Sequence, residues 1–383
     1  MSTYYVSESG LRAFLEALTN EAEVYGTVER EERLDYEGLD RDNIKLVTLN
    51  TVRSYASPKA VLFPVTERVA TYSRTGSGET RIEEPTRVLV GMRQCDLAAI
   101  HMLDLVFLEG DYVDPFYKAR RDSTILVSTD CRDAAESCFC TLVGGKPYPT
   151  AYYDMNLSPL GEGCIAETGS EKGEALIRKH ADFFTTPTEE QLKERERNRE
   201  AITKQVVEQN KEFEPERSIQ EVFEGEIDEK KLQKLAWDCV ECGACTNICP
   251  SCHCFLMFDR PAAAAVESVK AETGLPTRNT SRLGVPGEAP DSVRMGKEMY
   301  ERLRMWDSCV FGEYARMAGV AGMKPNPRAE FRTRFANRFL HKYLNFYRMF
   351  RQFQCSGCGR CFDACSGGID PRRVIKEMSK KDK

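Results

Sequence analysis

Two runs of four cysteines repeat one spacing in this 383-residue chain. Both follow C-x2-C-x2-C-x3-C. Three thiolates separated by two residues can wrap three iron corners of one cubane, while the fourth cysteine points away and reaches a second cubane. The spacing therefore predicts two 4Fe–4S clusters with crossed ligands. Cluster A would take Cys239, Cys242, Cys245 and Cys365, and cluster B would take Cys355, Cys358, Cys361 and Cys249.

A pair of zinc sites is the alternative, because repeated CxxC motifs also bind zinc tetrahedrally. Two complete four-cysteine runs favour iron–sulfur clusters over two zinc knuckles. Pro250 follows the first run, as is typical of ferredoxins, whereas Ser366 follows the second. We still expect Cys365 to be a ligand, in a looser turn. The long segment between Cys249 and Cys355 predicts a ferredoxin core with a large insertion.

A third group of cysteines lies nearer the N-terminus. Cys95 follows a predicted strand at 86–90, Cys131 follows another at 123–128, and Cys138 and Cys140 come shortly after. Loops at the ends of neighbouring strands can face one another, so four thiolates could converge there. We expect a third 4Fe–4S cluster or another metal site. The alternative is a set of buried thiols, since no regular motif links these cysteines.

Three further cysteines lie close to the first run or follow it. They are Cys252, Cys254 and Cys309. They are candidates for a direct metal role or for the surroundings of a cluster. Cysteine is also often buried as a small apolar residue, and this remains the alternative for all three.

The order of predicted elements indicates an α+β fold. Residues 1–170 alternate short strands (60–64, 86–90 and 123–128) with a helix at 96–108, which predicts an α/β domain. Residues 171–235 interleave opposite charges and predict a helical connector, interpreted as a solvated spacer. Residues 236–383 predict a mainly helical, ferredoxin-like dicluster domain.

Within that last part, residues 258–293 are rich in Pro, Gly, Ser and Thr and predict a loop. Residues 295–305 and 328–353 predict helices. The second of these is full of arginine and aromatic residues, which are enriched at interfaces. A docking role is one interpretation, and a helix packed inward with a basic outer face is an equal one.

Charge and hydropathy exclude several classes of protein. With 54 basic and 60 acidic residues, the chain lacks the basic excess of a nucleic-acid binder. No apolar run is long enough to span a bilayer, and the N-terminus lacks the basic region of a secretory signal. We therefore expect a cytoplasmic protein, where cysteines bind metal more often than they form disulfides. No G-x-G-x-x-G or P-loop fingerprint is present, so no nicotinamide site is expected.

The motifs together resemble the beta subunits of soluble sulfhydrogenases and NAD(P)-linked hydrogenases, and the A-type subunits of anaerobic sulfite reductases. The resemblance covers most of the chain. It rests on Arg93-Gln-Cys95-Asp96, Asp114-Pro-Phe-Tyr117, Cys131 with Cys138-Phe-Cys140, Cys239–Pro250, Cys252-His-Cys254, Trp306-Asp-Ser-Cys309, His341-Lys342 and the final cysteine run. Gln94 departs from the Pro or Ala usual in the family. Because the family also has cysteine at the isolated positions, the resemblance favours a third metal site.

The resemblance implies an iron–sulfur subunit without catalytic residues of its own. Such subunits pass electrons between a flavoprotein subunit, linked to NAD(P)H or ferredoxin, and a catalytic oxidoreductase subunit. Hydrogenase, sulfite reductase and heterodisulfide reductase are the catalytic partners that we expect. Two alternatives remain: a redox enzyme with its own reactive cluster or flavin in the N-terminal domain, and a zinc-stabilised scaffold.

Overall fold

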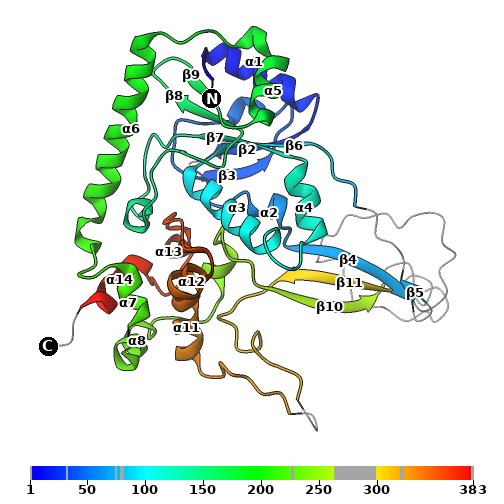
Figure 1. Cartoon of the computed structure of the whole chain (residues 1–383), viewed down its shortest axis with the longest axis vertical. Helices are drawn as coiled ribbons and strands as arrows, with labels where there is room; N and C mark the ends of the chain where they lie inside the picture. Colours follow the sequence, from blue (N-terminus) through cyan, green and yellow to red (C-terminus); the bar gives the residue numbers. More distant parts are fainter. Residues whose placement is uncertain are drawn as a thin grey trace.

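The computed structural model describes residues 2–31, 33–73, 76–77, 82–225, 228–262, 299–319 and 323–380. A seven-stranded sheet forms the N-terminal half (Figure 1), with strand order β1-β9-β8-β7-β6-β2-β3. Its central strands β2, β6, β7 and β8 run parallel, and β1, β9 and β3 pair antiparallel at the two edges. The strands are β1 (Thr3–Val6), β2 (Glu23–Arg30), β3 (Arg33–Gly38), β6 (Arg87–Met92), β7 (Thr124–Thr129), β8 (Met155–Pro159) and β9 (Cys164–Thr168).

Helices cover both faces of this sheet. Val88 and Val90 of β6 pack with the first face, under α1 (Glu8–Thr19) and α5 (Glu171–Lys179). Leu89 and Met92 point to the other face, which is covered by the helices α2 (Lys59–Leu62), α3 (Gln94–Phe107) and α4 (Pro115–Asp122). Because β6 and β7 are buried on both faces, they read as continuous apolar runs, as strands of parallel sheets do. The α+β fold class is confirmed.

A second, four-stranded sheet joins the two halves of the chain. Its order is β10-β11-β4-β5, all antiparallel. The strands are β4 (Thr66–Ser73), β5 (Gly76–Ser77), β10 (Phe255–Pro261) and β11 (Met299–Trp306). β4 belongs to the predicted domain 1–170, whereas β10 and β11 belong to the predicted domain 236–383. The sheet therefore contains strands from both. The division of the chain at 170 and 235 stays a prediction.

Two expectations for the later segments are wrong where the structure describes them. Residues 299–305 form β11 rather than a helix, and residues 258–261 belong to β10 rather than to a loop. Pairing with β4 outweighs the local pattern, because it buries Leu303 and joins Arg304 to the buried carboxylate of Glu67. The remainder of 258–298 beyond Ala262 lies outside the described residues.

Of the other elements predicted for the N-terminal half, two strands and one helix are confirmed and one strand is wrong. The strands at 86–90 and 123–128 and the helix at 96–108 are present as β6, β7 and α3. The predicted strand at 60–64 is wrong, since Pro58 precedes the short helix α2, which buries Lys59 and Leu62. Proline is well suited to a helix start because its φ is already helical.

The rest of the chain is mainly helical. After the sheet come α6 (Glu189–Asn210), α7 (Ile219–Glu224) and α8 (Glu229–Leu235), then α9 (Ala244–Asn247), α11 (Phe331–Leu340), a π-helical turn (His341–Asn345), α12 (Phe346–Phe350), α13 (Arg360–Asp363) and α14 (Pro371–Ser379). In the described residues, 3-10 turns lie at Ile44–Leu46, Cys140–Val143, Ala181–Phe183 and Lys211–Phe213. Among the described helices, none is long and apolar enough to cross a membrane.

Candidate cluster sites

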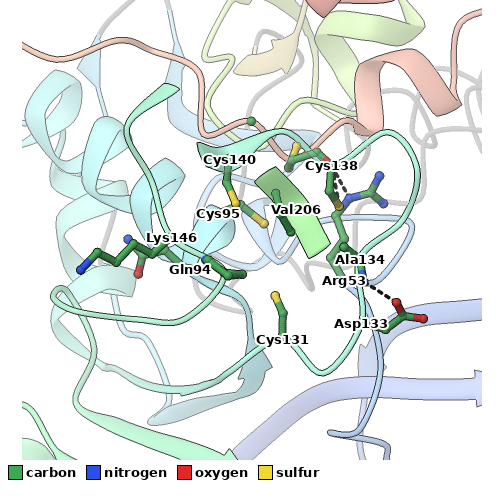
Figure 2. Close-up of a pocket in the computed structure, with 13 residues that line it drawn as sticks. Arg53, Gln94, Cys95, Cys131, Asp133, Ala134, Cys138, Cys140, Lys146 and Val206 are labelled. Carbon is green, nitrogen blue, oxygen red and sulfur yellow. Dashed lines mark hydrogen bonds between the residues drawn. The ribbon is translucent and has the colours of Figure 1, made fainter. Parts of the chain in front are cut away.

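Four N-terminal cysteines line one cavity at the carboxyl ends of two neighbouring parallel strands. Cys95 opens α3 directly after β6, and Cys131 follows β7. Cys138 and Cys140 lie on the loop after Cys131, and all four thiols border the same pocket. Figure 2 shows these side chains grouped around it, with Val206 of α6 among them. The convergence expected from the sequence is therefore present.

Buried polar contacts hold these loops in place. Arg93, which is almost fully buried, donates to the carbonyl oxygens of Asp130 at 2.5 Å and Leu49 at 3.0 Å. Asp96 accepts a hydrogen bond from the backbone N–H of Arg93 and closes the first turn of α3 as a capping box. The loop carrying Cys131 is thereby tied to the helix that carries Cys95.

Helix α6 forms a wall of this cavity. Gln209 donates to the carbonyl oxygens of Ala135 and Cys138, both at 2.9 Å. Asn210, which is buried, donates to the same Cys138 carbonyl at 2.8 Å. Interpreting this segment as a solvated spacer is thus wrong for α6, since its Val206 face packs on the cysteine loop. The short apolar stripe of α6 is hard to recognise in the sequence because charged residues surround it.

A second cavity gathers cysteines from both four-cysteine runs. Cys249 from the first run and Cys355, Cys358 and Cys361 from the second all line it. This is the crossed set that the spacing predicts for cluster B. The cavity shows that these thiols converge, and their role as iron ligands stays a prediction.

The two cavities adjoin, and Cys358 borders both of them. Phe139 donates its backbone N–H to the carbonyl oxygen of Gly357 at 2.7 Å. Gly357 has a φ of +67°, and a Cβ there would lie 2.5 Å from the Cα of Cys140. Only glycine suits this left-handed backbone against a neighbouring loop. The second run is therefore packed directly on the loop of Cys138 and Cys140.

The predicted cluster A set is gathered in part. The helix α9, which follows Gly243, and α13 of the second run lie in contact. Burial raises the pKa of Cys239, and the nearby thiols of Cys245 and Cys365 raise it further, so these three are neighbours. Cys242 is the one exposed cysteine among the sixteen. The predicted cluster A therefore lies nearest the protein surface.

Two buried cations, Lys342 and Arg338, face these cysteines, and neither has a carboxylate partner among the described residues. The ammonium of Lys342 donates to Cys249 Sγ at 3.3 Å, to Ser251 Oγ at 3.3 Å and to the Gln354 carbonyl at 3.2 Å. Arg338 is buried beside the same cavity, and its Nε has no hydrogen-bond partner among the described residues. A buried charge is costly unless an opposite charge compensates it.

Negative charge on the cysteine sulfurs would supply that compensation. Burial alone would lower the pKa of Lys342, yet the neighbouring thiols of Cys249 and Cys252 hold it well above its usual range. Lys59 shows the opposite balance, because burial lowers its pKa to about 8 and the cysteines offset this only in part. A cubane with four thiolates is anionic, so the site's charge fits such a group.

Further cations mark the junctions between the cysteine sets. Arg338 interacts electrostatically with Cys245 of the first run and Cys361 of the second. Arg53 donates to the Cys358 carbonyl and interacts with Cys138, thus bridging the second run and the N-terminal loop. Neither Arg53 nor Arg338 was predicted from the sequence. Arg360 lies inside the second cysteine run, so the sequence does indicate a cation near the cysteines there. Arg53 and Arg338 lie outside both runs and carry no such signal.

The arginine-rich segment points partly inward. Arg334 is buried and donates to the Val310 carbonyl at 2.9 Å, and it pairs with Glu241. Arg332 is exposed and pairs only with Glu330 among the described residues. Of the two interpretations, inward packing is correct for Arg334 and Arg338.

The remaining cysteines form two contacts rather than one group. Cys252 interacts with Cys249, and Cys254 interacts with Cys309. In the described part of the chain, no three His, Cys, Asp or Glu side chains converge as a site for a single metal ion. Cys164 lies in β9 within the sheet core, away from all of these sets.

Comparison with known proteins agrees with this arrangement. The family described as "4Fe-4S dicluster domain" matches residues 288–369, which include the second cysteine run. The chain is 28% identical over 371 residues to "Sulfhydrogenase 2 subunit beta" of Pyrococcus furiosus, and the alignment covers 95% of each protein. The resemblance to sulfhydrogenase beta subunits is confirmed. The likeness spans the N-terminal sheet as well as the cysteine runs, so it extends to the cavity of Cys95 and Cys131.

Proposed function

We propose that this chain is an iron–sulfur electron-transfer subunit with three 4Fe–4S clusters. The observation that carries the proposal is the pair of adjoining cysteine cavities, which share Cys358. The second cavity also faces Lys342 and Arg338, two buried cations without a carboxylate partner among the described residues. The dicluster-domain match and the likeness to a sulfhydrogenase subunit support the same chemistry.

The proposed ligands follow the three cysteine sets. Cluster A takes Cys239, Cys242, Cys245 and Cys365, cluster B takes Cys355, Cys358, Cys361 and Cys249, and the third cluster takes Cys95, Cys131, Cys138 and Cys140. Cys252, in contact with Cys249, lies in the surroundings of cluster B. When bound, such clusters supply one-electron carriers whose potentials depend on charge, burial and hydrogen bonds.

The order of the cavities gives the proposed path. Cluster B lies in the middle, because its set adjoins the N-terminal cavity through Cys358 and faces Cys245 across Arg338. Cluster A lies at one end, beside the exposed Cys242. The third cluster lies at the other end, where Asp133 and Lys146 bring its cavity to the surface.

The charged residues around the proposed path have an electrostatic role and are not proposed to be catalytic. Lys342 and Arg338 would compensate negative charge at the central set. Arg53 lies at the junction with the N-terminal set, where it also pairs with Asp363. Burial of these cations keeps water from screening them, so each acts strongly on its neighbouring thiolates.

We further propose that the chain works within a complex. The relative is named as one subunit of a sulfhydrogenase. By that analogy, a flavoprotein is one partner, and the other is a catalytic oxidoreductase subunit such as a hydrogenase, sulfite reductase or heterodisulfide reductase. The two ends of the proposed path offer separate contact points for them.

Reductive titration of the isolated chain tests the relay. Anaerobically purified protein is expected to take up about three electrons on its clusters, one for each. It should contain no stoichiometric flavin and turn over no small substrate by itself. One bound flavin per chain, or substrate turnover by the lone chain, would instead support an enzyme with its own reactive centre.

A further inference from the structure

Two cysteines outside the proposed cluster sets face each other at the end of the second sheet. Cys254 directly precedes β10, and Cys309 comes three residues after β11. The pairing of Phe255 with Trp306 is continued by a hydrogen bond from the Asp307 N–H to the Cys254 carbonyl at 3.0 Å. The strand register therefore brings the two cysteine segments together.

The side chains of the two cysteines interact with each other. The Cys254 sulfur interacts with the thiol of Cys309 and with the backbone N–H of the same residue. The hydroxyl of Tyr314 interacts with the Cys254 sulfur as well. Three donors thus surround one sulfur, an arrangement that stabilises a thiolate there.

The segment that carries Cys309 is held firmly. Ser308 is fully buried, its hydroxyl is hydrogen-bonded to Thr246 Oγ1 at 2.7 Å, and it accepts a hydrogen bond from the Val310 N–H at 3.2 Å. Cys309 is buried, whereas Cys254 is only half-buried. The accessible sulfur is therefore that of Cys254, with Cys309 behind it.

We propose that Cys254 and Cys309 form a reversible disulfide, a two-electron redox couple beside the cluster path. The Cys254 thiolate attacks a low-molecular-weight disulfide such as oxidised glutathione, and one glutathione thiolate leaves. The Cys309 thiol then loses its proton, attacks the Cys254 sulfur of the mixed disulfide and releases the second glutathione. Two protein thiols are oxidised and one glutathione disulfide is reduced to two thiols.

The location links this couple to the proposed function, on which its redox role rests. Lys342, which contacts Cys249, also interacts electrostatically with Cys254 and Cys309. Electrons from two reduced clusters, with two protons, would return the disulfide to two thiols. The pair would then store two electrons next to carriers that hold one each.

Thiol mapping and electron counting test the proposal on the intact chain purified anaerobically with its iron. After treatment with oxidised glutathione and alkylation, mass spectrometry should find one peptide pair joined between Cys254 and Cys309. Iron content should not change. After glutathione is removed, reductive titration of this oxidised protein should require two more electrons than titration of the Cys254→Ser variant treated in the same way, because that variant lacks the attacking thiol.

The Cys164→Ser variant is the matched control, since Cys164 is buried in β9 and should leave both readouts unchanged. Absence of the joined peptide, or equal electron uptake by Cys254→Ser and the parent, would overturn the couple. Loss of about four iron atoms per chain in the Cys309→Ser variant would also overturn the proposal, because Cys309 would then be a cluster ligand. Failure of the proposed function would give a different result from failure of the disulfide couple, because the parent chain itself would then lack iron.

Discussion

Replacing Lys342 with methionine is expected to lower the reduction potential of one cluster by roughly 60 mV or more, a tenfold change for a one-electron couple. Lys342 is a buried ammonium whose described hydrogen-bond acceptors are Cys249 Sγ, Ser251 Oγ and the Gln354 carbonyl. Removing this positive charge makes an added electron less favourable at the set containing Cys249. An EPR-monitored redox titration of the reduced chain measures the shift.

The Lys118→Met variant is the control for this experiment. Lys118 pairs with Asp122 on an exposed surface of α4, so its removal should leave all potentials within error. The two other clusters should also change much less than cluster B in Lys342→Met. Unchanged potentials in Lys342→Met would contradict the assignment of Cys249 to a cluster beside this lysine.

Replacing Arg360 with methionine is expected to destabilise the folded chain by about 3–5 kcal/mol. Arg360 is almost fully buried and pairs with Asp96 at 2.6 Å, thereby joining the second cysteine run to α3. It also donates to the carbonyl oxygens of Ser54 and Tyr55 at 3.0 and 3.1 Å. The variant leaves the Asp96 carboxylate buried without its counter-charge. Anaerobic chemical denaturation gives the free energy of unfolding.

Two further variants make this measurement specific. Arg12→Met removes an exposed i,i+4 pair with Glu8 and should cost less than about 1 kcal/mol. Adding Asp96→Asn to Arg360→Met should cost less than the sum of the two single changes, because the stranded charge is gone. A cost for Arg360→Met no larger than that for Arg12→Met would show that this buried pair does not hold the halves together.

The cysteine sets were predictable because ligand spacing is a local property of the sequence. The crossing of Cys249 with the second run follows from the ferredoxin spacing alone, and the structure places those thiols around one cavity. The convergence of Cys95 and Cys131 followed from their positions after two neighbouring strands. Their roles as ligands remain proposals.

The supporting parts were harder to predict because they depend on distant partners. The local sequence of strand β11 predicts a helix, because its partner β4 lies far away in the chain and leaves no local signal. Lys59 and Arg338 look like ordinary surface charges in sequence, yet both are buried against cysteines. The sequence of helix α6 indicates a spacer because its two buried apolar residues, Ile202 and Val206, are outnumbered by charges.

Iron and acid-labile sulfide per chain, measured on anaerobically purified protein, test the central claim most directly. About 12 iron atoms with matching sulfide are predicted, falling to about 8 in a Cys131→Ala variant, because the cavity of Cys95 and Cys131 would hold the third cluster. About 8 iron atoms in the parent chain, unchanged by Cys131→Ala, would contradict the third cluster. Zinc in place of iron would contradict the electron-transfer account as a whole.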